Sequence, residues 1–397
     1  MGYALLKEVH FPLEVVILLV AGLALIITGI LLFPVSLGML PYYEEGLYGL
    51  FLVLFSLQTI GLGKTPFGDA LRSNGVVAAG ICIAGIGVIA CFIPGILGPI
   101  PAALLFVCFS LGGLSQLLQL FLAREKYKTW IQYGGIFNRL ITGCGSVYSL
   151  SILMGLLVLK PSLLATKMIA LLILIYGIAI TYLAFVLKSI YHRYPEDETR
   201  IKGSEDLSTD KVMILLLSVF MLILGLLLIP VNLGILPFAA NAQLGLLMTI
   251  FAIQMMALGS TPIGPFSRSR LVIVLGFLFA SLGIVSIVIP EILVSPLTIL
   301  VGLLNICGGI VSLWRLLVPR LTKEEKTCPP SHPILVKLFI TQLALGLLSV
   351  LFGTSMLVSN LIPGIIIGIV LTSNGAVLLY LLVILIYLDR MVAGIHG

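Results

Sequence analysis

Charged residues are scarce in this sequence. Only 10% of its 397 residues are Asp, Glu, Lys or Arg, whereas a soluble globular domain carries about 25%. The hydrophobic share is 60% and the mean hydropathy is +1.23. This composition excludes an ordinary soluble domain and indicates an integral membrane protein. The polar stretches between the apolar runs are too short to fold around a core of their own.

The chain also lacks the motifs of common enzymes and metal sites. Its six cysteines are scattered without a CxxC pair, and its four histidines are equally dispersed. No nucleophile triad, phosphate loop, HExxH or haem motif occurs. The sequence therefore predicts no catalytic residue, no metal site and no cofactor, and it argues against an enzyme. The net charge of +6 is spread between apolar runs, which argues against nucleic-acid binding.

Apolar runs recur along the whole length of the chain. Nearly all of them reach the roughly 17–25 residues that a helix needs to cross a bilayer. We therefore expect an all-α, polytopic bundle of about twelve transmembrane helices surrounded by the lipid bilayer. The expected spans are residues 11–33, 46–62, 75–93, 102–123, 140–159, 166–187, 212–229, 243–259, 271–289, 297–314, 338–358 and 361–388.

Basic residues are segregated between alternate loops. All but two of the 22 lysines and arginines fall at the termini or in even-numbered loops, and only Lys160 and Lys167 fall in odd-numbered loops. The positive-inside rule then places both termini in the cytoplasm of a multi-pass protein of the cell membrane. We expect a first six-helix unit over 1–190, a cytoplasmic linker over 191–211 and a second six-helix unit over 212–397.

The sequence aligns with itself at an offset of 196 residues without a gap. PVSLGMLPYYEEG (34–46) meets PVNLGILPFAANA (230–242), and LQTIGLGKTPFGDALRS (57–73) meets IQMMALGSTPIGPFSRS (253–269). This degree of identity exceeds what shared hydrophobicity produces, so the sequence predicts an internal repeat. Each repeat has an even number of helices, so the two halves are expected to lie parallel, related by an axis along the membrane normal.

Small residues recur seven positions apart in five of the six odd-numbered helices, and the fifth helix breaks the pattern. Seven residues make about two helical turns, so each pair lines one face and lets a neighbouring helix approach closely. We expect helix packing at Gly22, Gly29, Gly80, Gly87, Gly225, Gly276, Gly283, Gly346 and Gly353. The smallest repeating unit is therefore expected to be a two-helix hairpin.

AAGICIAGIGVIACFIP (78–94), followed by LLFVCFSLGGLSQLLQLF (104–121), resembles the short-repeat membrane proteins of the HdeD type. The resemblance rests on glycine spacing, a closing proline and a glycine-rich partner helix, and it covers residues 12–122 and 208–318 best. Members of that family are bacterial inner-membrane proteins linked to acid resistance. The resemblance implies a structural or stress-related membrane protein with no chemistry of its own. This chain is twice as long and adds loops of the pattern Thr-Pro-x-Gly.

The Thr-Pro-x-Gly loop is the most strongly repeated loop motif, and it places Arg72 and Arg268 at matching positions. Paired cytoplasmic arginines fit a site for anionic lipid head groups or for a phosphorylated ligand. The Gly/Asp/Arg pattern from Gly61 to Arg72 also resembles a loop motif of major facilitator transporters. A third interpretation is structural, because Thr-Pro begins a turn, Gly68 bends it and the arginine anchors the next helix.

Two glutamines, Gln58 and Gln254, stand at matching positions within the spans. An amide in hydrocarbon needs a partner, so each is a candidate for a hydrogen bond between helices or for a polar substrate path. Within the expected spans the only Asp, Glu, Lys or Arg residues are Glu14 and Lys167, each near one end of its span, and Arg139 and Arg315 border two others. This scarcity of charge argues against ion coupling.

The alternative to the HdeD-like role is therefore a facilitator-type secondary transporter or permease for a small or apolar substrate, with its cavity between the two halves. Both functions leave the partners open, and a homo-oligomer or a complex with another membrane protein fits either.

Overall fold

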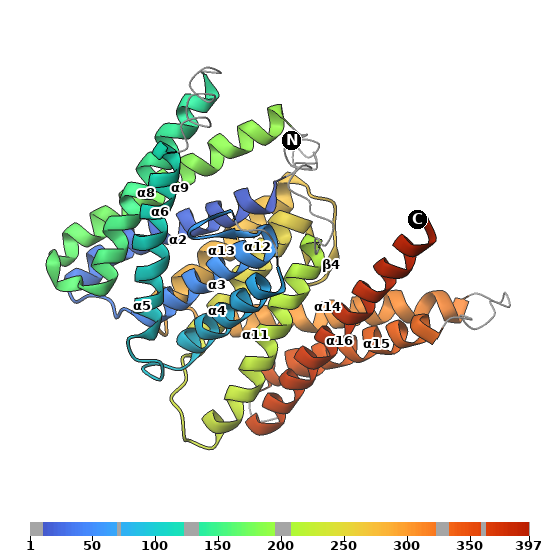
Figure 1. Cartoon of the computed structure of the whole chain (residues 1–397). Coiled ribbons are helices and arrows are strands. Elements are labelled where there is room, and N and C mark those ends of the chain that lie inside the picture. Colours follow the sequence, from blue (N-terminus) through green and yellow to red (C-terminus); the bar gives the residue numbers. More distant parts are fainter. Residues whose placement is uncertain are drawn as a thin grey trace. The chain divides into compact units, whose positions relative to one another are not determined.

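The protein is an all-α, multi-pass membrane protein (Figure 1). Its structure, a computed structural model, describes residues 11–69, 73–122, 135–194, 208–322, 333–358 and 363–396. Within these residues twelve helices are long and apolar enough to cross a membrane. Each expected span overlaps one of these helices, so the predicted fold class is confirmed.

The helices have the following bounds. The first six spans are α2 (Leu13–Ser36), α3 (Glu44–Leu62), α4 (Asn74–Phe92), the continuous run of α5 (Ile100–Phe106), η1 (Val107–Leu111) and α6 (Gly112–Leu122), α8 (Ile136–Leu159) and α9 (Thr166–Arg193). The other six are α11 (Thr209–Asn232), α12 (Ala240–Leu258), α13 (Arg270–Val288), α14 (Val294–Thr322), α15 (Pro333–Leu357) and α16 (Gly364–His396). The short elements are η2 (Pro161–Leu163) and the antiparallel pairs β1 (Lys64–Thr65) with β2 (Gly68–Asp69) and β3 (Ser260–Thr261) with β4 (Gly264–Pro265).

Helix bounds recur at the offset of the sequence alignment. α2 begins at Leu13 and α11 begins at Thr209, which are 196 residues apart. The bounds of α3 and α12, of α4 and α13, and of the two β pairs are displaced by the same 196 residues. Corresponding stretches of sequence therefore adopt the same local structure.

The described chain forms two compact units. The first consists of Met1–Ser208, Ala239–Gly259 and Ser267–Leu293, and the second of Thr209–Phe238, Ser260–Phe266 and Val294–Gly397. In the first unit α2 packs against α9, α3 against α4, and α6 against α8, and the α12–α13 hairpin packs beside α2. In the second unit α11 packs against α16 and α14 against α15. Hairpins are thus formed by the second and third spans and by the fourth and fifth spans of each set.

Two backbone hydrogen bonds join the α3–α4 hairpin to the α12–α13 hairpin. The Tyr43 amide donates to the Val288 carbonyl at 3.0 Å, and the Ala239 amide donates to the Phe92 carbonyl at 2.9 Å. Tyr43 corresponds to Ala239 in the sequence alignment, and Phe92 corresponds to Val288. Each hairpin therefore donates a hydrogen bond to the other from equivalent positions, as two copies related by a two-fold axis do.

Glycines lie where the packed helices approach most closely. A Cβ atom on Gly87 would lie 2.8 Å from the Gly49 carbonyl oxygen, and one on Gly283 would lie 2.6 Å from the Gly245 carbonyl oxygen. These distances are too short for any side chain, so α3 with α4 and α12 with α13 pack backbone against backbone. The remaining glycines of the sequence pattern contact α9 (Gly22, Gly29), α3 (Gly80), α16 (Gly225), α12 (Gly276) and α14 (Gly346, Gly353).

Candidate functional site

A cavity of about 410 Å³ lies inside the first six spans. Its walls come from α2, α3, the η1–α6 segment, α8 and α9, and the β1–β2 loop closes one end. Its lining includes Glu14, Leu54, Phe55, Gln58, Lys64, Cys144, Ser151 and Tyr176, together with Phe51 and Phe109 at its inner end. Small-molecule sites commonly have volumes of about 300–1,000 Å³, so this cavity has room for a small ligand.

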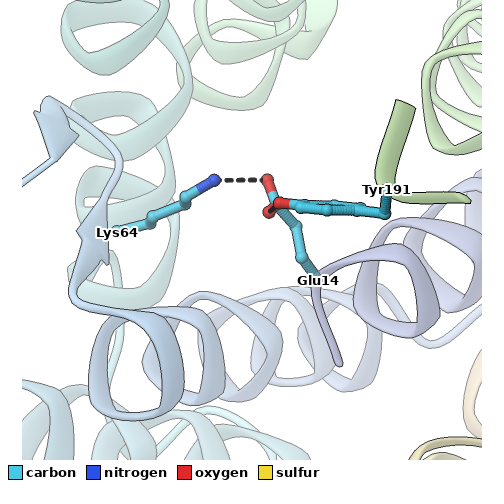
Figure 2. A network of polar contacts seen from close by, with 3 residues as sticks. All are labelled: Glu14, Lys64 and Tyr191. Carbon is cyan, nitrogen blue, oxygen red and sulfur yellow. Dashed lines mark hydrogen bonds and ion pairs between the residues drawn. The ribbon is translucent and has the colours of Figure 1, made fainter. Parts of the chain in front are cut away.

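Three side chains form a polar network at the end of this cavity. Figure 2 shows the Glu14 carboxylate between Lys64 and Tyr191. The Lys64 Nζ donates to Glu14 Oε1 at 2.7 Å, and the Tyr191 hydroxyl donates to Glu14 Oε2 at 2.6 Å. Both carboxylate oxygens are therefore engaged. Glu14 lies in the first turn of α2, Lys64 lies in β1 just after α3, and Tyr191 lies in the last turn of α9, so the network ties three segments together at one side of the bundle.

The β1–β2 turn is built by its own sequence. The Thr65 hydroxyl donates to the Gly68 carbonyl oxygen at 2.8 Å, and Thr261 repeats this bond to Gly264 at the same distance. Gly68 has φ +131° and Gly264 has φ +146°, which only glycine adopts without strain. The Thr-Pro-x-Gly motif therefore specifies a tight turn in both places.

The β1–β2 loop is docked on α6 by side-chain amides. Gln116 donates to the Pro66 carbonyl oxygen at 3.2 Å, and Gln119 donates to the Phe67 carbonyl oxygen at 2.7 Å. The Ser115 hydroxyl donates to the same Phe67 oxygen at 3.1 Å. Backbone carbonyls that no helix satisfies thus find partners on α6, which holds the loop across the end of the cavity.

A second cavity of about 220 Å³ lies in the same bundle, towards its opposite side. It is lined near its outer end by Tyr42, Glu44 and Tyr48. The Tyr48 hydroxyl donates to Glu44, and burial together with the nearby Glu44 carboxylate raises the pKa of Tyr42 above its ordinary value. Tyr42 therefore keeps its proton and is a neutral hydrogen-bonding group.

Aromatic rings separate the two cavities. Phe51 and Phe109 line both of them. The Phe109 ring packs edge to face on Phe51 at 5.7 Å, on Phe55 at 5.1 Å and on Tyr176 at 6.1 Å between ring centroids. Such edge-to-face contacts are favourable, so the rings form a cohesive layer across the bundle.

Phe109 belongs to a π-helical turn, η1, between α5 and α6. A π turn breaks the regular ladder of hydrogen bonds of an α-helix and is frequent at functional sites. Here α8 supports the turn: the Ser151 hydroxyl donates to the Phe109 carbonyl oxygen at 2.8 Å, and the Ser110 hydroxyl donates to the Ile152 carbonyl oxygen at 2.8 Å. The ring at the boundary thus sits on an irregular turn of the helix.

The polar residues singled out in the sequence are separated by the structure. Gln58 lines the first cavity, whereas Gln254 is half-buried on α12. Arg268 is half-buried and has an interaction partner. Arg72 and most of the 191–211 linker lie outside the described residues. Of these candidates, only Gln58 is a described part of the site.

Sequence reasoning gave too little weight to Glu14 and missed Phe109. A carboxylate inside an apolar helix is a functional-site signal by default, and Glu14 carried that signal. Phe109 carried none, because a phenylalanine in an apolar run looks the same whether it faces lipid or a cavity. The expected cavity was one between the halves, and the two cavities found here lie inside the first six spans.

Among the described residues no group of three or more His, Cys, Asp and Glu side chains is arranged to hold a metal ion. No protein-family model and no curated protein matches the sequence, and no solved structure matches the fold.

Proposed function

We propose that the protein is a facilitator-type membrane transporter whose substrate path runs through its first six spans. One observation carries this proposal: two cavities lie end to end on the same five spans and share the residues at their boundary. A packed bundle with a purely structural role needs neither cavity, because membrane helices pack most stably without voids.

The order of lining residues along α3 describes the path. Glu44 and Tyr48 line the second cavity, Phe51 lines both, and Phe55 and Gln58 line the first. These positions follow one face of a helix, about one turn apart. The lining residues of α9 follow the same order: those near its beginning line the second cavity, and those nearer its end line the first. The lining therefore extends over most of the bilayer thickness.

Two closures fit alternating access along such a path. The Glu14–Lys64–Tyr191 network and the docked β1–β2 loop close one end, and the rings around Phe109 close the middle. A substrate that displaced the network from one side, and then the rings, would cross without both closures opening together. Since the ionic groups of the first cavity already neutralise each other, the proposed transport is uncoupled from ions.

We infer the orientation from the distribution of basic residues, which places the Lys64 end of the path in the cytoplasm and both termini there as well. The recurrence of helix bounds at 196 residues supports an origin by duplication of a six-span ancestor. In this proposal the protein is a multi-pass protein of the cell membrane.

Cysteine labelling in inverted and right-side-out vesicles tests the path. A membrane-impermeant methanethiosulfonate should reach the native Cys144 from the Lys64 side, and a Leu47→Cys substitution in the second cavity from the other side. Cys91 is fully buried and is the internal control that should remain unlabelled. If neither position reacts from either side, the path is closed and the transport proposal is wrong.

A structural, HdeD-like role in membrane stress is the second candidate, and the backbone contacts at Gly49 and Gly87 favour it. This role predicts that activity, measured as growth of a deletion strain under acid stress, depends on helix packing and not on the cavity. A Phe109→Ala variant that folds normally and complements fully would support this second candidate over transport.

A further inference from the structure

We infer that the first cavity selects an uncharged, amphipathic small molecule and recognises its polar group through Gln58. This inference rests on the proposed transport function and names its substrate class. It follows from three properties of the cavity: its charge balance, its one unpaired amide and its apolar walls.

The charges that line the cavity cancel. Among the described residues that line the cavity, Glu14 and Lys64 are the only Asp, Glu, Lys or Arg side chains, and they pair at 2.7 Å. The second carboxylate oxygen of Glu14 is occupied by Tyr191. An anion or a cation entering the cavity would meet no free counter-charge on this described lining, in a medium of low dielectric constant, which strongly disfavours it. A neutral molecule meets no such penalty.

Most hydrogen-bonding groups of the cavity wall are already used. The Ser151 hydroxyl donates to the Phe109 carbonyl, and the Gln116 amide donates to the Pro66 carbonyl. Gln58 differs, since within the described part of the chain its amide makes no hydrogen bond. An amide offers two donors and an acceptor, so Gln58 can recognise a carbonyl, hydroxyl or amide group on a ligand.

Between Gln58 and the inner end of the cavity the wall is apolar or aromatic. Leu54 and Phe55 precede Gln58 on α3, and Phe109 and Tyr176 face the same cavity from other helices. Such a surface favours a ligand with an apolar or aromatic body. The expected ligand is therefore a compact molecule that carries one neutral polar group on an apolar body.

A matched series of probes tests this class on the purified full-length protein. Benzamide, benzoate, benzylammonium and toluene share a ring and differ in charge and hydrogen bonding. Each is tested for protection of Cys144 against N-ethylmaleimide, with labelling quantified by peptide mass spectrometry. Cys82 lies on α4 outside the cavity and reports any general effect of the probe on the reagent. Benzamide should protect Cys144 at concentrations at which benzoate and benzylammonium do not.

Gln58→Leu should weaken protection by benzamide about fivefold, as expected for one lost hydrogen bond, and should leave protection by toluene intact. Retained protection by toluene shows that the variant is folded with its cavity open. Gln254→Leu is the control, because Gln254 occupies the matching position on α12 and should leave benzamide protection unchanged.

Two results would overturn the inference alone: equal protection by a charged probe, or unchanged benzamide protection in Gln58→Leu. Complete lack of reaction at Cys144 in the unprotected protein would mean that the first cavity is closed and would also overturn the inference. If Leu47→Cys were unreactive as well, the transport proposal would be wrong too. The ligand class is thus tested by protection of Cys144 by the probes, whereas the path is tested by cysteine labelling without any probe.

Discussion

The ring centroids of Phe51 and Phe109 lie 5.7 Å apart in an edge-to-face contact. Phe51 comes from a regular helix, α3, and Phe109 comes from the π turn η1. Both residues line both cavities, so this pair stands at the boundary between them. A rearrangement of the π turn would move one ring of the pair and leave the other in place.

The Glu14–Lys64 pair should behave as a coupled unit in stability measurements. Glu14→Gln or Lys64→Gln alone leaves one charge of the cavity uncompensated and should lower the free energy of unfolding by about 1–3 kcal/mol. This is less than for a fully buried pair, since the Lys64 side chain is 25% exposed.

The double variant Glu14→Gln/Lys64→Gln removes both charges and should lose less stability than the sum of the two single variants. Thermal denaturation in detergent micelles measures all four proteins of the cycle. Additive losses would show that the two groups act independently and would remove the network as a closure of the path.

The contact between Gly87 and Gly49 predicts a sharp intolerance to side chains. A Cβ atom on Gly87 would lie 2.8 Å from the Gly49 carbonyl oxygen, so Gly87→Leu forces α3 and α4 apart. We expect a loss of about 3 kcal/mol in stability. Size-exclusion chromatography and thermal melting of the purified protein measure the effect.

Gly145→Ala on α8 is the matched control, because a Cβ atom built there meets no described atom within 4 Å beyond its chain neighbours and the backbone of its own helix. Alanine at that position should leave stability unchanged or raise it slightly. An equal loss of stability from both substitutions would mean that the backbone contact between α3 and α4 is not the reason why Gly87 cannot carry a side chain.

The proposed orientation makes a prediction about accessibility of the chain ends. Epitope tags before Met1, within the 191–211 linker and after Gly397 should all be reachable only from the cytoplasm, because basic residues are retained there. Protease protection in intact and permeabilised cells measures this. A tag found outside would contradict the orientation of the path.

The spans could be predicted from the sequence because a helix surrounded by lipid needs apolar side chains over its whole length. Apolar runs therefore identified all twelve helices, including the short α3 and α12. The turn at Gly68 and the repeat of its local structure at Gly264 were also expected, since glycine and proline specify turns through backbone geometry alone. Gln58 was singled out because an amide in hydrocarbon is conspicuous.

The arrangement of the helices could not be predicted in the same way. In lipid both faces of a helix are apolar, so the sequence does not say that Gly22 on α2 meets α9 or that Phe109 faces a cavity. The Glu14–Lys64 contact joins residues 50 positions apart and depends on how the loop docks on α6. Long-range packing of this kind leaves no periodic signal in the sequence.

The central claim is that one continuous path is interrupted at Phe109, and labelling of Leu47→Cys from the Lys64 side tests it most directly. In the parent protein the reagent should stop at the rings, and Phe109→Ala should raise the labelling rate from this side about tenfold by opening the constriction. Leu187→Ala is the control, because Leu187 lines only the first cavity, one turn of α9 before Tyr191, and should have little effect. If Leu47→Cys stays unreactive from the Lys64 side in a folded Phe109→Ala protein, the two cavities are not parts of one path.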